Sequence, residues 1–426
     1  MNLAEDALLR GMARKRILFI QHAGALGGSA YSLLYTLRAL RPLGFEGEVA
    51  LIRPGSAVRA LYEEEGFPTY DAPLIDILAH TTGGWARWAN ARSVVQLVRQ
   101  VLHWRRSGRE TLRLLRETKP DLVHLNSAVL APSAFALRRA KVPFVWHIRE
   151  CPPNQGLRTA FLRQQMIAAR WVVFISQHDQ EQWVRGQHGA VIPNFVDWDA
   201  VRAAPTREQA RRAVGVGPDR PVVLYVGGLS SIKGFRVILR AAALILRRRP
   251  NVVFLMPSAK PLLAERGLKR NLQSALAKFG LGTRGQMLVR YIKNKGMESS
   301  VLLLPFATNI LDYLAACDVL VFPSVKPHFA RPAIEAAAMS RPVVGSDIGG
   351  VRELIVPKVT GLLVPPGDSN ALAAAIVQML DNPSSAVTMG CQARNRAHAL
   401  YDAQVNVCDI ARIYGKALGG AAAASE

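Results

Sequence analysis

The amino-acid sequence predicts an α/β fold made of two doubly wound, parallel-sheet domains that face each other across a cleft. The chain has 426 residues, enough for two domains that each bury a hydrophobic core. Half of the residues are hydrophobic and 20% are charged, which is typical of a globular protein. Both halves of the chain also begin in the same way, with an apolar strand, a glycine-containing turn and a helix.

The first half opens with a predicted strand at 17–20 and a helix over 31–40, and the turn between them holds Gly27 and Gly28. Such a unit begins a Rossmann-like domain, because glycine lets the backbone and a ligand approach each other closely. Short apolar runs predict three further buried strands, at 122–125, 144–148 and 171–176.

The second half repeats the pattern with a strand at 221–226, a turn that contains Gly227, Gly228 and Lys233, and a helix to about 248. Apolar runs predict further strands at 251–256, 299–305 and 318–322. We therefore expect a second Rossmann-like domain.

The charge of the chain is unusual, with a net value of +23 and an isoelectric point near 10.6. Nucleic acid, an anionic membrane surface and phosphorylated substrates are the partners that such a charge suits. Nucleic acid fits least, because the basic residues lack regular aromatic neighbours and no known recognition module is visible. The four cysteines show no paired spacing, and no apolar run is long enough to span a membrane, so we expect a cytoplasmic protein with free thiols.

The stretch from 323 to 368 is the most informative part of the chain. The strand at 318–322 stops at Pro323-Ser324, and a helix then opens near Pro332 with Glu335 in its first turns. This order places a loop and a helix N-terminus at the C-terminal edge of a parallel sheet, where α/β proteins bind anionic ligands. A carboxylate at that edge suits the paired hydroxyls of a ribose, so the stretch indicates a nucleotide-type ligand.

The same stretch resembles the donor-site signature of the retaining GT-B glycosyltransferases of family 4 (glycosyl transferases group 1). The family's second acid corresponds to Glu335, and the position of its first acid is occupied by Pro327. Three further motifs of the signature follow in register, at 342–344, 349–353 and 361–368.

The resemblance implies a donor site in the second half. It assigns Lys233 to the donor diphosphate and Glu335 to the ribose hydroxyls, and it adds Gly227 and Ser324 to the donor-binding residues. The family has an arginine where this chain has Gly228, and Arg331 is a candidate replacement. A solvated loop lysine and a carboxylate favoured by a helix dipole are the plainer interpretations of Lys233 and Glu335.

The first half carries three candidate residues by the same resemblance. His147 matches a family histidine near the transferred sugar, and we list it with Lys233 as catalytic. Gly27 and Gly28 match a glycine loop that approaches the donor phosphate and the acceptor. A core histidine and an ordinary strand-to-helix turn are the alternatives.

The implied activity is metal-independent transfer of a hexose, with retention, from a UDP- or GDP-sugar to a lipid-linked or polysaccharide acceptor in cell-envelope glycan synthesis, such as lipopolysaccharide. The sequence shows no cofactor motif, no His/Cys cluster at metal-ligand spacing and no Asp-x-Asp with supporting acids. Two other classes stay open. Pro327 and Gly228 allow a catalytically degenerate homologue that serves as a binding or scaffold subunit, and a sugar-nucleotide epimerase would use the same architecture.

A basic segment at 85–116 predicts contact with a membrane. On a helix over 94–106, the apolar residues Val94, Val95, Leu97, Val98, Val101 and Leu102 share one face. Arg92, Arg99 and Arg106 form a stripe beside that face, and Trp88 flanks it. An apolar face, a basic border and tryptophans are what an interfacial helix needs, so we expect peripheral binding to the inner face of the plasma membrane. The alternative is that the apolar face packs on the sheet.

The resemblance also sets the domain boundaries. The N-terminal, acceptor-binding domain is expected at 14–198 and the C-terminal, donor-binding domain at 199–395. The polar stretch 199–220 is the expected linker, and a final helix over about 392–418 is expected to return to the first domain, with 396–420 as the crossover segment. The basic segment 260–295 is an expected surface insertion.

Overall fold

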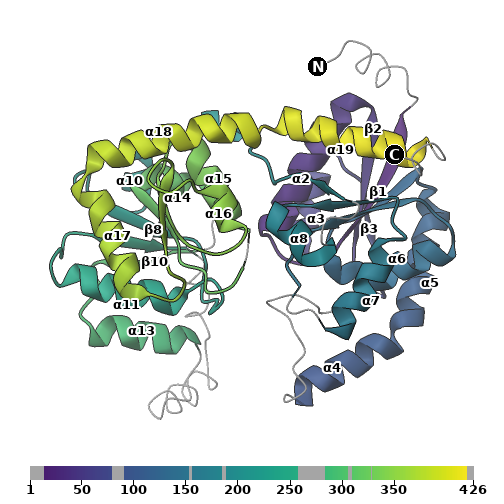
Figure 1. The fold of residues 1–426 in the computed structure, drawn as a ribbon, viewed down its shortest axis with the longest axis horizontal. Helices are drawn as coiled ribbons and strands as arrows, with labels where there is room; N and C mark the ends of the chain where they lie inside the picture. Colours follow the sequence, from purple (N-terminus) through teal and green to yellow (C-terminus); the bar gives the residue numbers. More distant parts are fainter. Residues whose placement is uncertain are drawn as a thin grey trace. The chain divides into compact units, whose positions relative to one another are not determined.

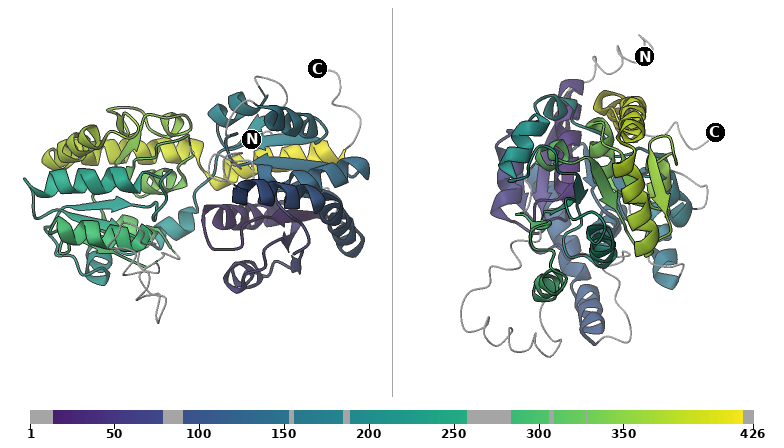
Figure 2. Two further views of the ribbon diagram at one scale, coloured as in Figure 1. Left: turned by 90° about the horizontal axis from the view of Figure 1, so that it is seen from below. Right: turned by 90° about the vertical axis from the view of Figure 1, so that its left-hand side faces the viewer.

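The chain forms two compact units. The computed structural model describes residues 14–78, 91–152, 156–184, 189–257, 284–305, 309–327 and 329–419. Unit 1 comprises the described residues up to Phe195 and from Leu400 onward, and unit 2 comprises those of Val196–Ala399. Each unit holds a parallel sheet between layers of helices (Figures 1 and 2), which confirms the two predicted Rossmann-like domains.

Unit 1 is built on a parallel sheet of seven strands in the order β3-β2-β1-β4-β5-β6-β7. The strands are β1 (Lys15–Gln21), β2 (Phe45–Leu51), β3 (Thr69–Asp71), β4 (Leu122–Leu125), β5 (Phe144–Ile148), β6 (Trp171–Phe174) and β7 (Ala190–Val191). Their apolar runs follow from burial on both faces, since successive side chains of a strand point to opposite sides. In β1, Ile17 and Phe19 enter one core, and Leu18 and Ile20 enter the other.

Helices cover both faces of this sheet. The helices that contribute to the Ile17 core are α2 (Gly28–Leu40), α3 (Ser56–Glu63) and α19 (Ala403–Leu418). Those that contribute to the Leu18 core are α5 (Trp104–Thr118), α6 (Ala131–Arg139), α7 (Leu157–Met166) and α8 (Gln177–Val184). The helix α4 (Ala91–Leu102) projects beyond them (Figure 1).

Unit 2 contains a six-stranded parallel sheet in the order β10-β9-β8-β11-β12-β13. The strands are β8 (Val222–Tyr225), β9 (Val253–Met256), β10 (Val301–Leu303), β11 (Val319–Phe322), β12 (Val343–Ser346) and β13 (Gly361–Val364). The helices are α9 (Trp198–Arg202), α10 (Arg207–Ala213), α11 (Phe235–Leu246), α13 (Arg284–Asn294), α14 (Leu311–Ala316), α15 (Arg331–Ala338), α16 (Val351–Leu354), α17 (Ser369–Asp381) and α18 (Pro383–Leu400). In both units the order of strands reverses beside the first strand, which creates a crevice at the carboxyl ends of β1 and β4 and of β8 and β11.

The stretch 199–220, predicted to be a linker, is instead a packed part of unit 2 that contains α10 and most of α9. Thr206 and Gln209 form a capping box at the start of α10. The Arg211 side chain is only 2% exposed and donates to both carboxylate oxygens of Asp318 at 3.0 and 2.8 Å. Arg211, one of the arginines that led to the linker prediction, therefore anchors this stretch to unit 2.

The predicted single helix over 392–418 is two helices. α18 lies in unit 2 except for its last residue, Leu400, and α19 begins at Ala403 in unit 1. The Asp402 carboxylate caps α19 by accepting a hydrogen bond from the backbone N–H of Gln404 at 2.7 Å, which starts a new helix there. α19 then returns to unit 1, where the Tyr414 hydroxyl lies 2.6 Å from Nδ1 of the buried His124.

The predicted helix over 94–106 is also interrupted. α4 ends at Leu102 and α5 begins at Trp104, with His103 at φ −81° and ψ −1° between them. The His103 imidazole contacts the Asp76 carboxylate at 3.2 Å, and Trp104 packs edge to face against Phe135. Arg99 therefore lies in α4 and Arg106 in α5, and the stripe of Arg92, Arg99 and Arg106 stays a prediction.

Two predicted features lie partly or wholly outside the described residues. Trp88 is not described, and of Arg92 only the backbone within α4 is. The predicted insertion 260–295 is described from 284 onward, where it forms α13.

Two buried histidines make the stability of unit 1 dependent on pH. His124 and His147 are almost fully buried, and burial beside the Arg149 guanidinium lowers the pKa of His124 to about 3 and that of His147 well below its ordinary value. Both rings are neutral in the folded chain, whereas the unfolded chain binds protons below pH 6.5. Their contribution to stability is therefore complete above about pH 6.5 and is lost as pH falls toward the folded-state pKa.

We expect the urea concentration at the midpoint of unfolding to decrease as the pH is lowered from 7.5 to 5, and to decrease less in His147→Phe. Each buried histidine contributes up to ~1.4 kcal/mol per pH unit in that window. Phenylalanine keeps an aromatic ring beside His124, whose centroid lies 5.4 Å from that of His147, but it removes the titrating group. An equal loss in wild type and variant would contradict this origin of the pH dependence.

Candidate functional site

The carboxyl ends of β8 and β11 bring together four of the donor residues that the sequence predicts. These two strands are neighbours, with Leu320 in register with Leu224. The loop after β8 carries Lys233 and leads into α11, and the loop after β11 carries Ser324 and leads into α15. Arg331 and Glu335 lie on α15 itself. The crevice of unit 2 therefore lies between the two loops that the sequence singles out.

The two loops touch backbone to backbone. Gly234 has φ +77°, and a Cβ atom at this position would lie 1.9 Å from the Pro323 carbonyl oxygen, so no other residue fits without displacing a loop. The Ile232 carbonyl accepts hydrogen bonds from the Ser324 hydroxyl at 2.9 Å and from the Val325 N–H at 2.8 Å. Ser324 thus joins the two loops, and its hydroxyl is committed to backbone carbonyls.

Lys233 is a cation without a counter-charge in this part of the fold. Burial lowers the pKa of its ammonium group. Among the residues that the structure describes, none accepts a hydrogen bond from Lys233 or forms an ion pair with it. A desolvated ammonium group without a partner has a strong tendency to bind an anion, because its lost hydration is not otherwise compensated.

Arg331 and Glu335 are paired with each other. The Arg331 Nε donates to Glu335 Oε1 at 2.9 Å, one helical turn apart, and the two side chains are only 10% and 13% exposed. Burial raises the pKa of the Glu335 carboxyl, and the Arg331 charge and hydrogen bond oppose that rise. The carboxylate has further acceptor sites for a ligand's hydroxyl groups, whereas the Arg331 charge is already balanced.

Gly227 and Gly228 shape the start of the Lys233 loop. A Cβ atom at Gly227 would lie 2.1 Å from the Tyr225 hydroxyl, so glycine is needed there for the packing of β8 itself. Gly228 has φ +53°, a left-handed conformation that glycine adopts without cost. The Tyr225 hydroxyl is buried and has no hydrogen-bond partner among the described residues.

In unit 1, Gly27 and Gly28 lie at the corresponding crevice, between the end of β1 and the start of α2. Gly27 has φ 175°, which any residue adopts, and a Cβ atom there would meet no atom of the described residues within 4 Å. The packing and backbone of the described fold thus give no reason for glycine at 27.

His147 lies inside unit 1. It is on the interior strand β5, only 3% exposed, and its Nδ1 is 3.5 Å from the Arg149 guanidinium. Its Nε2 is buried and has no partner among the described residues. The low pKa keeps the ring neutral. This burial matches the alternative of a core histidine, and a catalytic role for His147 stays a prediction.

The same edge of unit 1 holds a polar network that sequence reasoning missed. The Arg149 guanidinium donates to Asn126 at 2.6 Å, to Ser32 at 2.8 Å and to Asn194 at 2.7 Å. The neighbouring Glu150 accepts from the Ser127 hydroxyl at 2.6 Å. The position of Asn126-Ser127 directly after β4 and of Arg149-Glu150 directly after β5 is the signal that could have found them.

The described residues show neither a ready-made metal site nor a membrane-spanning helix. No group of three or more His, Cys, Asp or Glu side chains there is arranged to hold a metal ion. In the same residues, every helix is too short or too polar to cross a membrane.

Sequence models of two glycosyltransferase domains match successive parts of the chain. The model described as Glycosyltransferase Family 4 matches residues 26–200, and the model described as Glycosyl transferases group 1 matches residues 206–396.

Solved structures of GT-B type share the fold over nearly all of the chain. The UDP-glucose complex of Anabaena HepE has a TM-score of 0.72 and 21% identity, covering 94% of this chain and 99% of that one. A glycosyltransferase from Rickettsia africae has a TM-score of 0.73 and 19% identity, covering 96% and 100%.

The chain therefore belongs to the family 4 glycosyltransferases and has the GT-B fold. Among curated relatives, the D-inositol 3-phosphate glycosyltransferase of Streptomyces avermitilis is 27% identical over 85% of this chain and 73% of its own length. That of Kineococcus radiotolerans is 29% identical over 49% of this chain and 47% of its own length. The chain thus spans about half the length of most of the curated relatives it matches.

The pairing of Arg331 with Glu335 predicts strong coupling in a double-mutant cycle. We expect Arg331→Met and Glu335→Met each to lower the free energy of unfolding by about 3 kcal/mol, because each removes one member of a buried ion pair. The double variant should lose less than the sum of the two, with a coupling of at least ~1 kcal/mol in urea unfolding.

The matched control for this cycle is the exposed pair of Arg352 and Asp347, whose side chains are 62% and 43% exposed. Substitutions to methionine there should leave the free energy of unfolding nearly unchanged, because water screens an exposed pair. Additive losses at Arg331 and Glu335, or losses as small as in the control, would show that the pair contributes nothing beyond a surface contact.

Proposed function

We propose that this chain is a glycosyltransferase that moves a hexose from a UDP- or GDP-sugar, with retention and without a metal ion, to a lipid-linked or polysaccharide acceptor of the cell envelope. The observation that carries the donor part of this proposal is Lys233, a desolvated cation without a partner among the described residues, placed at the crevice of unit 2. A nucleoside diphosphate is the leaving group of such a reaction, and it needs positive charge where its own negative charge develops.

The relatives support a nucleotide sugar as donor. Two of the similar structures are complexes of Anabaena HepE with UDP and glucose and with UDP-glucose. The geometry of unit 2 suits such a ligand, with the Lys233 ammonium for the diphosphate and the remaining acceptor sites of Glu335 for the ribose hydroxyls.

The proposed chemistry uses the chain's own charges. Lys233 and the N-terminus of α15 stabilise the departing diphosphate, and a phosphate oxygen of that leaving group takes the proton of the acceptor hydroxyl. The Arg331 guanidinium holds Glu335 in position and is not itself assigned to the diphosphate, because it is already paired. Pro327, in place of the family's first acid, leaves the contacts to the donor sugar to other groups.

We expect UDP or GDP to raise the melting temperature of the protein, and Lys233→Met to abolish most of that shift. A ligand at about a hundred times its dissociation constant adds ~2.7 kcal/mol of apparent stability. The control is Lys293→Met, which removes an exposed lysine of the same unit from α13. A panel of UDP, GDP and ADP measures the preference, and equal shifts in wild type and Lys233→Met would remove Lys233 from the donor site.

Two alternatives predict different outcomes once binding is established. A degenerate homologue binds the nucleotide but releases none from the nucleotide sugar in the presence of acceptor. An epimerase interconverts the nucleotide sugar without any acceptor. The names of the curated relatives also favour a second acceptor class, inositol phosphates, so inositol 3-phosphate belongs beside lipid-linked glycans in the transfer assay.

The membrane part of the proposal rests on α4. Four apolar side chains of this helix are exposed, namely Val95 (67%), Val98 (52%), Val101 (60%) and Leu102 (73%). Their exposure argues against the alternative that this face packs on the sheet. Arg99 is exposed on the same helix, and Arg105, Arg106 and Arg109 are exposed on the next. An anionic lipid surface suits both the apolar face and these cations.

We expect the protein to float with phosphatidylcholine vesicles that contain phosphatidylglycerol, and not with phosphatidylcholine alone. Replacing Val98 and Val101 with serine, or Arg99 and Arg106 with glutamate, should reduce the bound fraction several-fold because each basic residue contributes ~1 kcal/mol near an anionic surface. The control is Val405→Ser, which removes a similarly exposed valine (57%) from α19. Binding that is unchanged in both sets, or absent from wild type, would contradict membrane docking through α4.

A further inference from the structure

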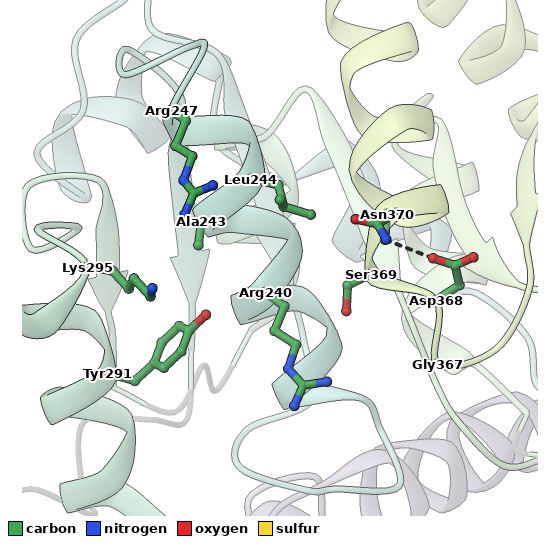
Figure 3. A pocket seen from close by; sticks show the side chains of 10 residues that line it. All are labelled: Arg240, Ala243, Leu244, Arg247, Tyr291, Lys295, Gly367, Asp368, Ser369 and Asn370. Carbon is green, nitrogen blue, oxygen red and sulfur yellow. Dashed lines mark hydrogen bonds between the residues drawn. The ribbon is translucent and has the colours of Figure 1, made fainter.

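A hollow of about 440 Å³ lies on unit 2 between α11, α13 and the start of α17 (Figure 3). Its volume falls in the range of small-molecule sites, about 300 to 1,000 Å³. The residues that line it are Arg240, Ala243, Leu244, Arg247, Tyr291, Lys295 and those of 367–370. None of them belongs to the Lys233 loop or to α15, although Gly367 and Asp368 end the signature motif at 361–368. The hollow therefore contains none of the residues to which a donor contact is assigned.

Three cations gather around the hollow without a carboxylate partner. Arg240 and Arg247 come from α11 and the residue after its end, and Lys295 from the residue after α13. Among the described residues none of the three forms an ion pair. The nearby Arg249, by contrast, is paired with Asp381.

The cations around the hollow are also not balanced by acidic residues within their own helices. Neither α11 nor α13 contains an acidic residue. Arg236 and Arg240 are four residues apart on α11, a spacing at which like charges weaken a helix. Arg247 and Lys295 follow the C-terminal ends of their helices, where the helix dipole favours a cation, but Arg240 lies in mid-helix and gains no such stabilisation. An anionic ligand would balance all three charges.

The opposite side of the hollow is uncharged or acidic. Asp368 caps α17, and its Oδ1 accepts hydrogen bonds from the N–H groups of Asn370 and Ala371, both at 2.9 Å. Its Oδ2 has no partner among the described residues and can accept a hydrogen bond from a ligand hydroxyl. In Figure 3, Ser369 and Asn370 lie beside it, and the Tyr291 hydroxyl points toward α11 from the other side.

We propose that this hollow binds a sugar phosphate, with the phosphate between Arg240, Arg247 and Lys295 and the sugar hydroxyls toward Asp368 and Ser369. The cations match a dianion, and arginine matches phosphate oxygens through its planar set of donors. The free carboxylate oxygen of Asp368 would repel a second negative charge on the ligand. It therefore favours a ligand with one anionic end, at the cations, and hydroxyl groups at the end near Asp368. The site does not depend on the roles of Lys233 and Glu335 in donor binding, since neither residue lines it.

The test is isothermal titration calorimetry with glucose 6-phosphate at 150 mM salt, with and without saturating UDP. We expect glucose 6-phosphate to bind wild type in both conditions, and inorganic phosphate and glucose each to bind at least tenfold more weakly. The triple variant Arg240→Gln, Arg247→Gln, Lys295→Gln should lose at least tenfold in affinity.

The matched control removes the same charge outside the hollow, with Arg236→Gln, Arg248→Gln and Lys293→Gln, all exposed residues of the same segments. This variant should bind glucose 6-phosphate as wild type does. Four results would overturn the proposal: no binding to wild type, equal losses in both triple variants, competition by UDP, or equal affinity for inorganic phosphate. Lys233→Met separates this site from the donor site, because it should abolish UDP binding and leave glucose 6-phosphate binding unchanged.

Discussion

The backbone contact between Gly234 and Pro323 is the constraint on which the candidate donor site depends. It brings the loop after β8 against the loop after β11 at a distance that no side chain at 234 would permit. The hydrogen bonds that Ser324 and Val325 make to Ile232 then hold the two loops together. β8 and β11 are neighbours at the point where the strand order reverses. The contact therefore places the Lys233 loop beside the loop that connects β11 to α15.

The arginines and lysines of this strongly basic chain serve different physical purposes. Arg211 is buried and balanced by Asp318, so it holds the start of unit 2 to the sheet. Arg331 is likewise balanced, by Glu335, and orients a carboxylate. Lys233 has no such partner among the described residues, nor do the cations around the hollow at α11 and α13. The net charge of +23 is therefore a poor guide to function until each cation is sorted by whether its charge is already balanced.

The two crevices differ in how their polar groups are arranged. At the edge of unit 1, Arg149 is hydrogen-bonded to Asn126, Ser32 and Asn194, so that α2 is linked to residues that follow three separate strands. At the edge of unit 2, the loops are joined mainly through backbone carbonyls, and Lys233 is left without a partner among the described residues. Unit 1 thus offers a pre-organised polar surface at its crevice, and unit 2 offers an unbalanced positive charge.

The sequence alone determined the fold class, the strands at 17–20, 122–125 and 318–322, and the family, because buried parallel strands are continuous apolar runs and the donor motifs lie close together in the chain. Tertiary structure alone decided that Arg331 pairs with Glu335, that His147 is buried and that α4 exposes its valines. It also divided the predicted helices at His103 and at Asp402, and packed 199–220 into unit 2. The physical reason is that the local sequence shows only which residues are apolar and how they are spaced. Which residue pairs with a charge, and whether an apolar face is buried, depends on residues distant in the chain.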